Sequence, residues 1–235
     1  MESITLGIHF LDPLLKGSLA KTKNIVVGGR NDDAYEFSLR LASNWTNTQD
    51  ICLYGTISRT REEIISDLTS RDKEISVSIA NGSLRIVDYL ASAEEEPGTL
   101  EERIETLLNM TPNALEPEKF YQVFMRELRD ANSRHPGKKF LAIFDSLDTL
   151  FSAMGSEDSL RFAGLTFKVL EETNGVGVAL LCMERMPEET LEIVRYAADV
   201  FIVLEREERE KEIHRTFRII KPEGMPFSRD YLPWY

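Results

Sequence analysis

The chain has few residues that could form disulfide bonds or hold a metal ion. Its 235 residues include two cysteines, Cys52 and Cys182, and three isolated histidines. Each cysteine lies in an apolar run typical of a strand, so we expect two buried, reduced thiols. No Cys-x-x-Cys pair and no Cys/His spacing of the kind that binds zinc is present. The sequence therefore predicts no metal site.

Positive charge is also scarce. Lys and Arg number 28 against 40 Asp and Glu, which gives a net charge of −12. Nucleic-acid-binding proteins neutralise phosphates with Lys and Arg, so this balance disfavours binding to nucleic acid. One stretch near the C-terminus is richer in basic residues, but glutamates alternate with them, and we interpret it as a mixed, solvated ribbon. Its basic residues are Arg206, Arg209, Lys211, Arg215, Arg218 and Lys221.

Long apolar segments are absent as well. No run approaches the ~20 apolar residues that a membrane-spanning helix needs. Residues 1–5 lack the basic and apolar regions of a signal peptide, so we expect a cytoplasmic protein without a membrane partner. Hydrophobic residues make up 42% of the chain and charged residues 29%, as in ordinary globular proteins. With no break in composition, residues 1–235 are predicted to form one domain.

The chain does contain a regular alternation of short apolar runs and helical patterns after an amphipathic opening over 4–19. This alternation predicts an α/β fold with a doubly wound, mostly parallel sheet. The last two predicted strands flank a charged turn at 205–212 and form a C-terminal β-hairpin at the sheet edge. Strands are predicted at 25–27, 51–54, 84–88, 140–145, 176–183, 200–204 and 213–220. Helices are predicted at 32–47, 60–70, 100–109, 116–134, 157–173 and 188–197, with irregular segments at 71–83 and 91–99.

One stretch, residues 24–37, organises the rest of the chain. It is predicted to run from a buried strand through a turn at Gly28-Gly29 into a helix. Asp32 and Asp33 fall in the first turn of that helix, where the helix dipole favours negative charge. A strand, a glycine turn and a helix start are the elements with which P-loop proteins hold nucleotide phosphates.

Three other stretches carry a family resemblance. They are GIHFLDPLLKG at 7–17, FLAIFDS at 140–146 and RTFRIIKPEG at 215–224. In their order and spacing they resemble the RecA-like superfamily and, within it, the KaiC-like ATPase domains common in archaea. The resemblance covers nearly the whole chain and implies a RecA-like P-loop NTPase fold. It also implies an ATPase that assembles into rings or filaments, with ATP held at subunit interfaces.

The phosphate-binding residues that this resemblance implies are largely missing. A P-loop reads G-x-x-x-x-G-K-[ST], in which Lys contacts the phosphates and the hydroxyl holds Mg²⁺. Aligned without a gap, Gly28 keeps the first glycine, but Asp33, Ala34 and Tyr35 replace the last three residues. A carboxylate ~4 Å from a phosphate charge repels it by ~4 kcal/mol at an effective dielectric near 20.

Arg30 could offer a substitute charge, but we favour an exposed loop arginine that pairs with Asp32 or Asp33. Asp145 stands at the Walker B position, where a P-loop enzyme orients Mg²⁺. Without phosphate ligands we favour a structural role for it, such as capping the following turn. Glu184 stands where relatives often carry a polar sensor.

Two further catalytic groups of the family have no counterpart. Family members usually place a Glu-Glu pair after the second strand, and here Ser58-Arg59 stands there. Glu62-Glu63 follows, and we interpret it as the charged first turn of a helix. In relatives the last strand ends K-x-R-G and contacts the neighbouring subunit's phosphate. Here Lys221 is kept, but Glu223 replaces the arginine.

Four parts of the ATPase are therefore missing: the phosphate cradle, the cation, the base and the arginine supplied in trans. We predict that ATP hydrolysis is lost, and we expect no catalytic residue and no cofactor. What remains is a vestigial nucleotide site formed by Gly28, Gly29, Arg30, Asn31, Asp145 and Lys221.

Three functions stay open at this point. The leading hypothesis is a non-catalytic RecA/KaiC-like protein that acts by protein–protein binding, as a regulatory or assembly partner of an active homologue or as a homo-oligomer. The alternative is a nucleotide-binding protein or weak ATPase with a rearranged loop, in which Arg30 and Asp145 would hold ATP and Mg²⁺. The third is a recombination-type accessory protein on DNA, against which the net charge of −12 counts.

The aromatic, proline-rich tail at 225–235 has two interpretations, one of which is contact with a partner. We favour its folding back as an edge strand. The other interpretation is that it presents Trp234 and Tyr235 to another subunit, as aromatic anchors commonly do in interfaces.

Overall fold

The computed structural model describes residues 6, 24–48, 50–89, 117–173, 175–209, 212–221 and 232–233. The amphipathic opening at 4–19 lies outside this part of the chain, except for the buried Leu6. The predicted loop at 91–99 and the predicted helix at 100–109 also lie outside it.

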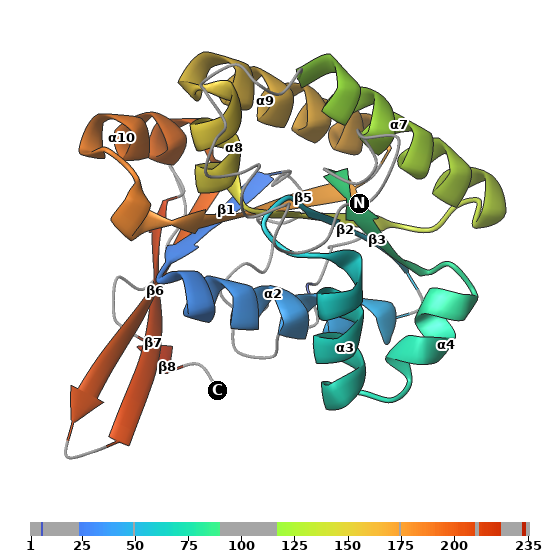
Figure 1. The fold of residues 1–235 in the computed structure, drawn as a ribbon, viewed down its shortest axis with the longest axis horizontal. Coiled ribbons are helices and arrows are strands. Elements are labelled where there is room, and N and C mark those ends of the chain that lie inside the picture. Colours follow the sequence, from blue (N-terminus) through green and yellow to red (C-terminus); the bar gives the residue numbers. More distant parts are fainter. Residues whose placement is uncertain are drawn as a thin grey trace.

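A single sheet passes through the middle of the molecule (Figure 1). Within the described residues its strand order is β3-β2-β4-β5-β1-β6-β7-β8. The six strands from β3 to β6 are parallel, and β7 and β8 are antiparallel additions at one edge. The strands are β1 (Asn24–Gly29), β2 (Ile51–Thr56), β3 (Leu84–Asp88), β4 (Phe140–Asp145), β5 (Gly175–Cys182), β6 (Val200–Arg209), β7 (Glu212–Lys221) and β8 (Leu232–Pro233).

Helices cover both faces of the sheet, as a doubly wound fold requires (Figure 1). One face carries α2 (Asn31–Thr46), α3 (Arg61–Arg71) and α4 (Ile75–Ala80). The other carries α7 (Pro117–Arg134), α8 (Leu147–Met154), α9 (Ser156–Glu172) and α10 (Glu188–Ala197). A short 3₁₀ turn, Met183–Arg185, follows β5. The predicted α/β class with a C-terminal hairpin is confirmed, and no described helix is long and apolar enough to cross a membrane.

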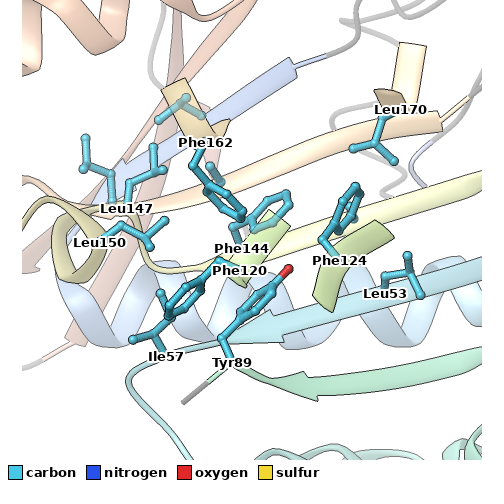
Figure 2. Close-up of a cluster of buried hydrophobic side chains, with 14 of the residues drawn as sticks. Leu53, Ile57, Tyr89, Phe120, Phe124, Phe144, Leu147, Leu150, Phe162 and Leu170 are labelled. Carbon is cyan, nitrogen blue, oxygen red and sulfur yellow. The ribbon is translucent and has the colours of Figure 1, made fainter. Parts of the chain in front are cut away.

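The two faces of the sheet bury separate apolar clusters. Successive residues of β1 alternate between them, because strand side chains have a period of two: Ile25 and Val27 pack against α2, and Val26 packs on the other side. The second cluster is rich in aromatic rings (Figure 2), and Tyr89 stacks on Phe120 with ring centroids 5.2 Å apart.

Three details differ from the sequence prediction. Residues 71–83 were expected to be irregular, but Ile75–Ala80 form the short helix α4, anchored by the buried Ile75. Helix α8 was not predicted. The prediction of a charged turn over 205–212 is wrong, since β6 and β7 remain paired as far as Arg209 and Glu212. Long charged side chains fit a strand whose faces are solvated, so the apolar pattern underestimates its length.

The edge-strand interpretation of the tail is confirmed for its described part. Leu232 and Pro233 pair with Phe217 and Thr216 of β7. Trp234 and Tyr235 lie outside the described residues, so the interpretation that they contact another subunit stays a prediction.

Gly55 makes room for the aromatic cluster. A Cβ added at Gly55 would lie 2.4 Å from Cε2 of Tyr89. We therefore expect Gly55→Ala to lower the free energy of unfolding by about 1–3 kcal/mol, as overpacking does. Urea denaturation measures this loss. The same substitution in a Tyr89→Ala background should cost much less, and equal costs in both backgrounds would show that the ring contact is not the cause.

Candidate functional site

The candidate site lies at the carboxyl edge of the parallel strands, where ligands bind in open α/β sheets. The connection between β1 and α2 differs from the prediction. Gly28 and Gly29 belong to β1 and do not form a turn, so only Arg30 separates the strand from the helix. The first helical hydrogen bond runs from the Ala34 amide to the Arg30 carbonyl, at 3.0 Å.

The two glycines of β1 are explained by packing. A Cβ at Gly28 would lie 2.9 Å from Sδ of Met183, and one at Gly29 would lie 3.0 Å from Cβ of Leu204. Both distances are too short for an ordinary carbon contact. Neighbouring side chains therefore occupy the space that these glycines leave.

Asp33 is buried at the start of α2, with 2% of its surface exposed. Its Oδ1 accepts a hydrogen bond from Nε of Arg215 on β7 at 2.9 Å. The carboxylate at the second glycine position of the P-loop pattern is thus paired within the chain. Asp32 is exposed on the same turn.

Arg30 lies on the surface. Its side chain is 60% exposed, and Nε is 3.7 Å from Oε1 of Glu184, which is exposed as well. The expected pairing with Asp32 or Asp33 is therefore replaced by a contact across the edge of the sheet. A surface pair of this kind contributes about 0–1 kcal/mol. Asn31 is half-buried as the first residue of α2.

Asp145 is buried at the end of β4 and paired with a cation. Nη1 of Arg59 lies 3.0 Å from its Oδ2. Ser58 donates to Oδ1 and Tyr54 donates to Oδ2, each at 3.4 Å. The side chain of Asp145 is thus engaged in this ion pair and does not cap the helix that follows.

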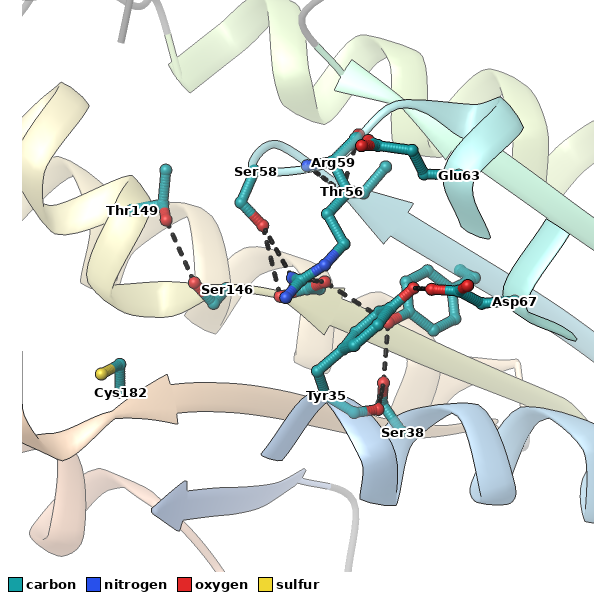
Figure 3. Close-up of polar contacts among 12 residues, drawn as sticks. Tyr35, Ser38, Thr56, Ser58, Arg59, Glu63, Asp67, Ser146, Thr149 and Cys182 are labelled. Carbon is teal, nitrogen blue, oxygen red and sulfur yellow. Dashed lines mark hydrogen bonds and ion pairs between the residues drawn. The ribbon is translucent and has the colours of Figure 1, made fainter. Parts of the chain in front are cut away.

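Arg59 is held on its other side by an aromatic ring. Its guanidinium carbon lies 3.6 Å above the ring centroid of Tyr35, a cation–π contact between the β2 end and α2 (Figure 3). The Tyr35 hydroxyl donates to Asp67 of α3 at 2.8 Å. Tyr35 stands at the hydroxyl position of the P-loop pattern, and its ring faces the arginine there.

Burial sets the ionisation of these groups. It raises the pKa of Asp145, an effect that the neighbouring Arg59 opposes. It also raises the pKa of Tyr35, helped by the hydrogen bond to Asp67. The pKa of Tyr54 is raised by burial and by the charge of Asp145. The tyrosines are therefore neutral donors at physiological pH, and Arg59 supplies the positive charge beside Asp145.

A third buried carboxylate at the same edge, that of Asp148, is paired in a similar way. Oδ1 of Asp148 on α8 accepts the Cys182 amide at 2.9 Å, and Oδ2 lies 3.4 Å from Nη1 of Arg185. This contact ties the start of α8 to the end of β5. Among the described residues, no group of three His, Cys, Asp or Glu side chains is arranged to hold a metal ion.

Glu63 forms a capping box with Thr60, and Glu62 lies in the same first turn of α3, which confirms the helical interpretation of both. Lys221 is the last residue of β7, opposite Phe201. Glu223 lies outside the described residues. The two cysteines are buried and unbonded, as expected.

Sequence reasoning missed the contact between Arg59 and Asp145. Arg59 follows β2 and Asp145 ends β4, and the carboxyl ends of parallel strands share one edge of a sheet. The adjacency of β2 and β4 was the missing information, because it brings residues 86 positions apart into contact.

Comparisons with known proteins give the family and the fold. A family model described as "ATPase: KaiC" matches residues 4–234. The flagellar accessory protein FlaH from Methanocaldococcus jannaschii is similar in structure, with a TM-score of 0.62 at 18% identity over 89% of this chain and 83% of that one. The uncharacterized protein PH0321 from Pyrococcus horikoshii, solved with an unknown peptide, has a TM-score of 0.71 at 17% identity over 99% and 100%. No curated protein matches the sequence.

Removal of Arg59 is expected to lower the free energy of unfolding, because the buried carboxylate of Asp145 loses its positive partner. Arg59→Met should lower the free energy of unfolding by about 3–5 kcal/mol near neutral pH, because Asp145 is left as an uncompensated buried charge. Since Arg59 lowers the pKa of Asp145, its loss raises that pKa further. The variant should therefore be most stable below this pKa, where the carboxyl is neutral, and lose stability as the pH rises through it.

Urea titrations across a pH series measure this dependence. The matched control is Arg59→Met with Asp145→Asn, which removes the titrating group and should not show the added pH dependence. If the single and double variants respond to pH identically, Asp145 is not the group that Arg59 neutralises.

Proposed function

The chain belongs to the KaiC ATPase family, and from the contacts at the carboxyl edge of its sheet we propose that it is a non-catalytic member that acts by binding another protein. In this role it regulates or assembles with an active homologue, or with further copies of itself. ATP and Mg²⁺ are not its cofactors.

The observation that carries the proposal is the ion pair between Arg59 and Asp145. In a P-loop enzyme the carboxylate at this position orients Mg²⁺. Here the guanidinium lies 3.0 Å from that carboxylate, with the Tyr35 ring packed against it. A metal ion could bind Asp145 only if Arg59 moved away from the carboxylate.

The start of α2 supports the same conclusion. A P-loop wraps several backbone N–H groups around a phosphate between its two glycines, whereas one residue separates β1 from α2. The first turn of α2 carries the exposed carboxylate of Asp32, while the charge of Asp33 is balanced by Arg215. A polyanion placed there would meet repulsion instead of the usual lysine.

Protein binding is the role that the fold retains once nucleotide chemistry is removed. Two structural relatives give context: one is named an accessory protein, and the other was solved with an unknown peptide. At 17–18% identity they share only the fold with this chain.

A second candidate is a nucleotide-binding protein or weak ATPase with a rearranged loop. The exposed position of Arg30 beside the start of α2 favours it, since a phosphate could displace Glu184 from that arginine. Residual turnover that disappears in Arg30→Ala and in Asp145→Asn would support this candidate. Absence of turnover in the unmutated protein would remove it.

The proposal predicts that ATP with Mg²⁺ does not raise the midpoint of thermal unfolding. A ligand at a hundredfold excess over its Kd stabilises the native state by about 2.7 kcal/mol, which a thermal shift assay detects readily. Tripolyphosphate with Mg²⁺ serves as the control for a general ionic effect. A saturable rise with ATP that tripolyphosphate does not reproduce would overturn the proposal.

A further inference from the structure

The turn between α4 and β3 contains an asparagine followed by a glycine, Asn81-Gly82. Because it precedes β3, it lies at the amino edge of the parallel strands, opposite the candidate site (Figure 1). Asn81 is exposed, and Gly82 has a φ of 79°, a conformation that favours glycine. Without a Cβ at residue 82, nothing shields the main-chain nitrogen of that residue from the neighbouring asparagine side chain. The turn that selects glycine therefore also leaves Asn81 open to attack by this nitrogen.

The reaction joins the main chain to the asparagine side chain. The Gly82 nitrogen loses its proton to hydroxide and attacks Cγ of Asn81, so that a new C–N bond forms. The side-chain nitrogen takes up a proton from water and leaves as ammonia, and a cyclic succinimide remains. Water then opens the ring at either of its two carbonyls, which gives an aspartate or an isoaspartate at position 81. The net change is the exchange of ammonia for water, so water is the only co-reactant.

The folded turn opposes ring closure. Asn81 ends α4 with φ −85° and ψ −6°. A ψ near zero eclipses the Gly82 nitrogen with the Asn81 nitrogen, so the side chain of Asn81 is rotated away from the attacking atom. The Gly82 amide donates to the Ile79 carbonyl at 3.2 Å, and Oδ1 of Asn81 accepts the Ser83 amide at 2.9 Å, as in an Asx turn. Ring closure therefore requires rotation about the Cα–C bond of Asn81, which breaks the hydrogen bond to Ile79.

This rotation depends on how easily α4 opens. The helix has six residues, and of these Ile75 alone is buried. A helix of this length has little stability of its own, so its packing against the sheet holds it in place. Segments with few buried side chains open locally at a lower free energy than the whole fold. We therefore expect α4 to open while the rest of the domain stays folded, and its opening releases the turn.

We propose that Asn81 is a site of spontaneous deamidation, which the folded turn slows until α4 opens locally. The product adds a carboxylate at the C-terminal end of α4, where the helix dipole disfavours negative charge. An isoaspartate also lengthens the main chain beside Ser83, whose carbonyl accepts the Cys52 amide of β2 at 2.8 Å. Modification is thus an irreversible mark of chains in which α4 has opened, and it weakens the start of β3. Because the reaction needs only water, the site is independent of the proposed function.

The test follows the full chain by mass spectrometry during incubation at mildly alkaline pH. Trypsin releases residues 74–85, in which Asn81 is the only Asn or Gln, so a change in mass is assigned to this residue. The other Asn-Gly pair, Asn174-Gly175, falls in a different peptide. Asn81 should react at least about tenfold faster in chains unfolded in guanidinium chloride than in folded chains, because the folded turn must first open.

Two matched variants separate local from global opening. Ile75→Ala loosens α4, and Leu191→Ala removes as many carbons from the apolar cluster on the other face of the sheet. In folded chains, whose state circular dichroism checks, Ile75→Ala should deamidate at Asn81 several times faster than the wild type, and Leu191→Ala should not. The inference is overturned if folded and unfolded wild type react equally fast, if Asn81 stays intact in the unfolded chain, or if folded Ile75→Ala reacts no faster than Leu191→Ala.

Discussion

The charge of Asp145 has to be balanced inside the protein, because a buried carboxylate without a partner costs several kcal/mol. In an enzyme of this fold a metal ion and its nucleotide share that task. Here Arg59, which follows the neighbouring strand β2, lies 3.0 Å from the carboxylate and balances its charge. The arginine is in turn positioned by the Tyr35 ring of α2, and Tyr35 by Asp67 of α3. One ion pair therefore links two strands and two helices at the edge where the family binds ATP.

The charge of Asp33 is balanced in the same way, by an arginine of the same chain. It is buried at the start of α2 and paired with Arg215 of the hairpin strand β7. Two buried aspartates thus take their positive charge from arginines of the same chain. The positions that ordinarily contact phosphate and metal now hold α2, β4 and β7 together. In the proposed non-catalytic role, arginines of the chain take the place of the external cation, and the fold is retained without its ligand.

The sequence predicted most of the architecture, because buried parallel strands read as β-branched runs and caps mark the helices. It failed where solvent exposure removes the apolar signal, as in the charged half of the β6–β7 hairpin, and where a helix is as short as α4. Replacement of the lysine and hydroxyl positions by Ala34 and Tyr35 could be read from the motif. The role of Arg59 could not be read from the sequence, since it depends on β2 lying beside β4. Gly28 and Gly29 were misplaced for a related reason: close packing and a phosphate turn both select glycine.

The central claim is that Arg59, and not a metal–nucleotide complex, neutralises Asp145. The most direct measurement is an anomalous diffraction map from crystals soaked in ATP and Mn²⁺. The account predicts that the Arg59 guanidinium stays in contact with Asp145, with no manganese peak beside the carboxylate. A manganese peak coordinated by Asp145, with Arg59 displaced and phosphate density at the start of α2, would contradict it.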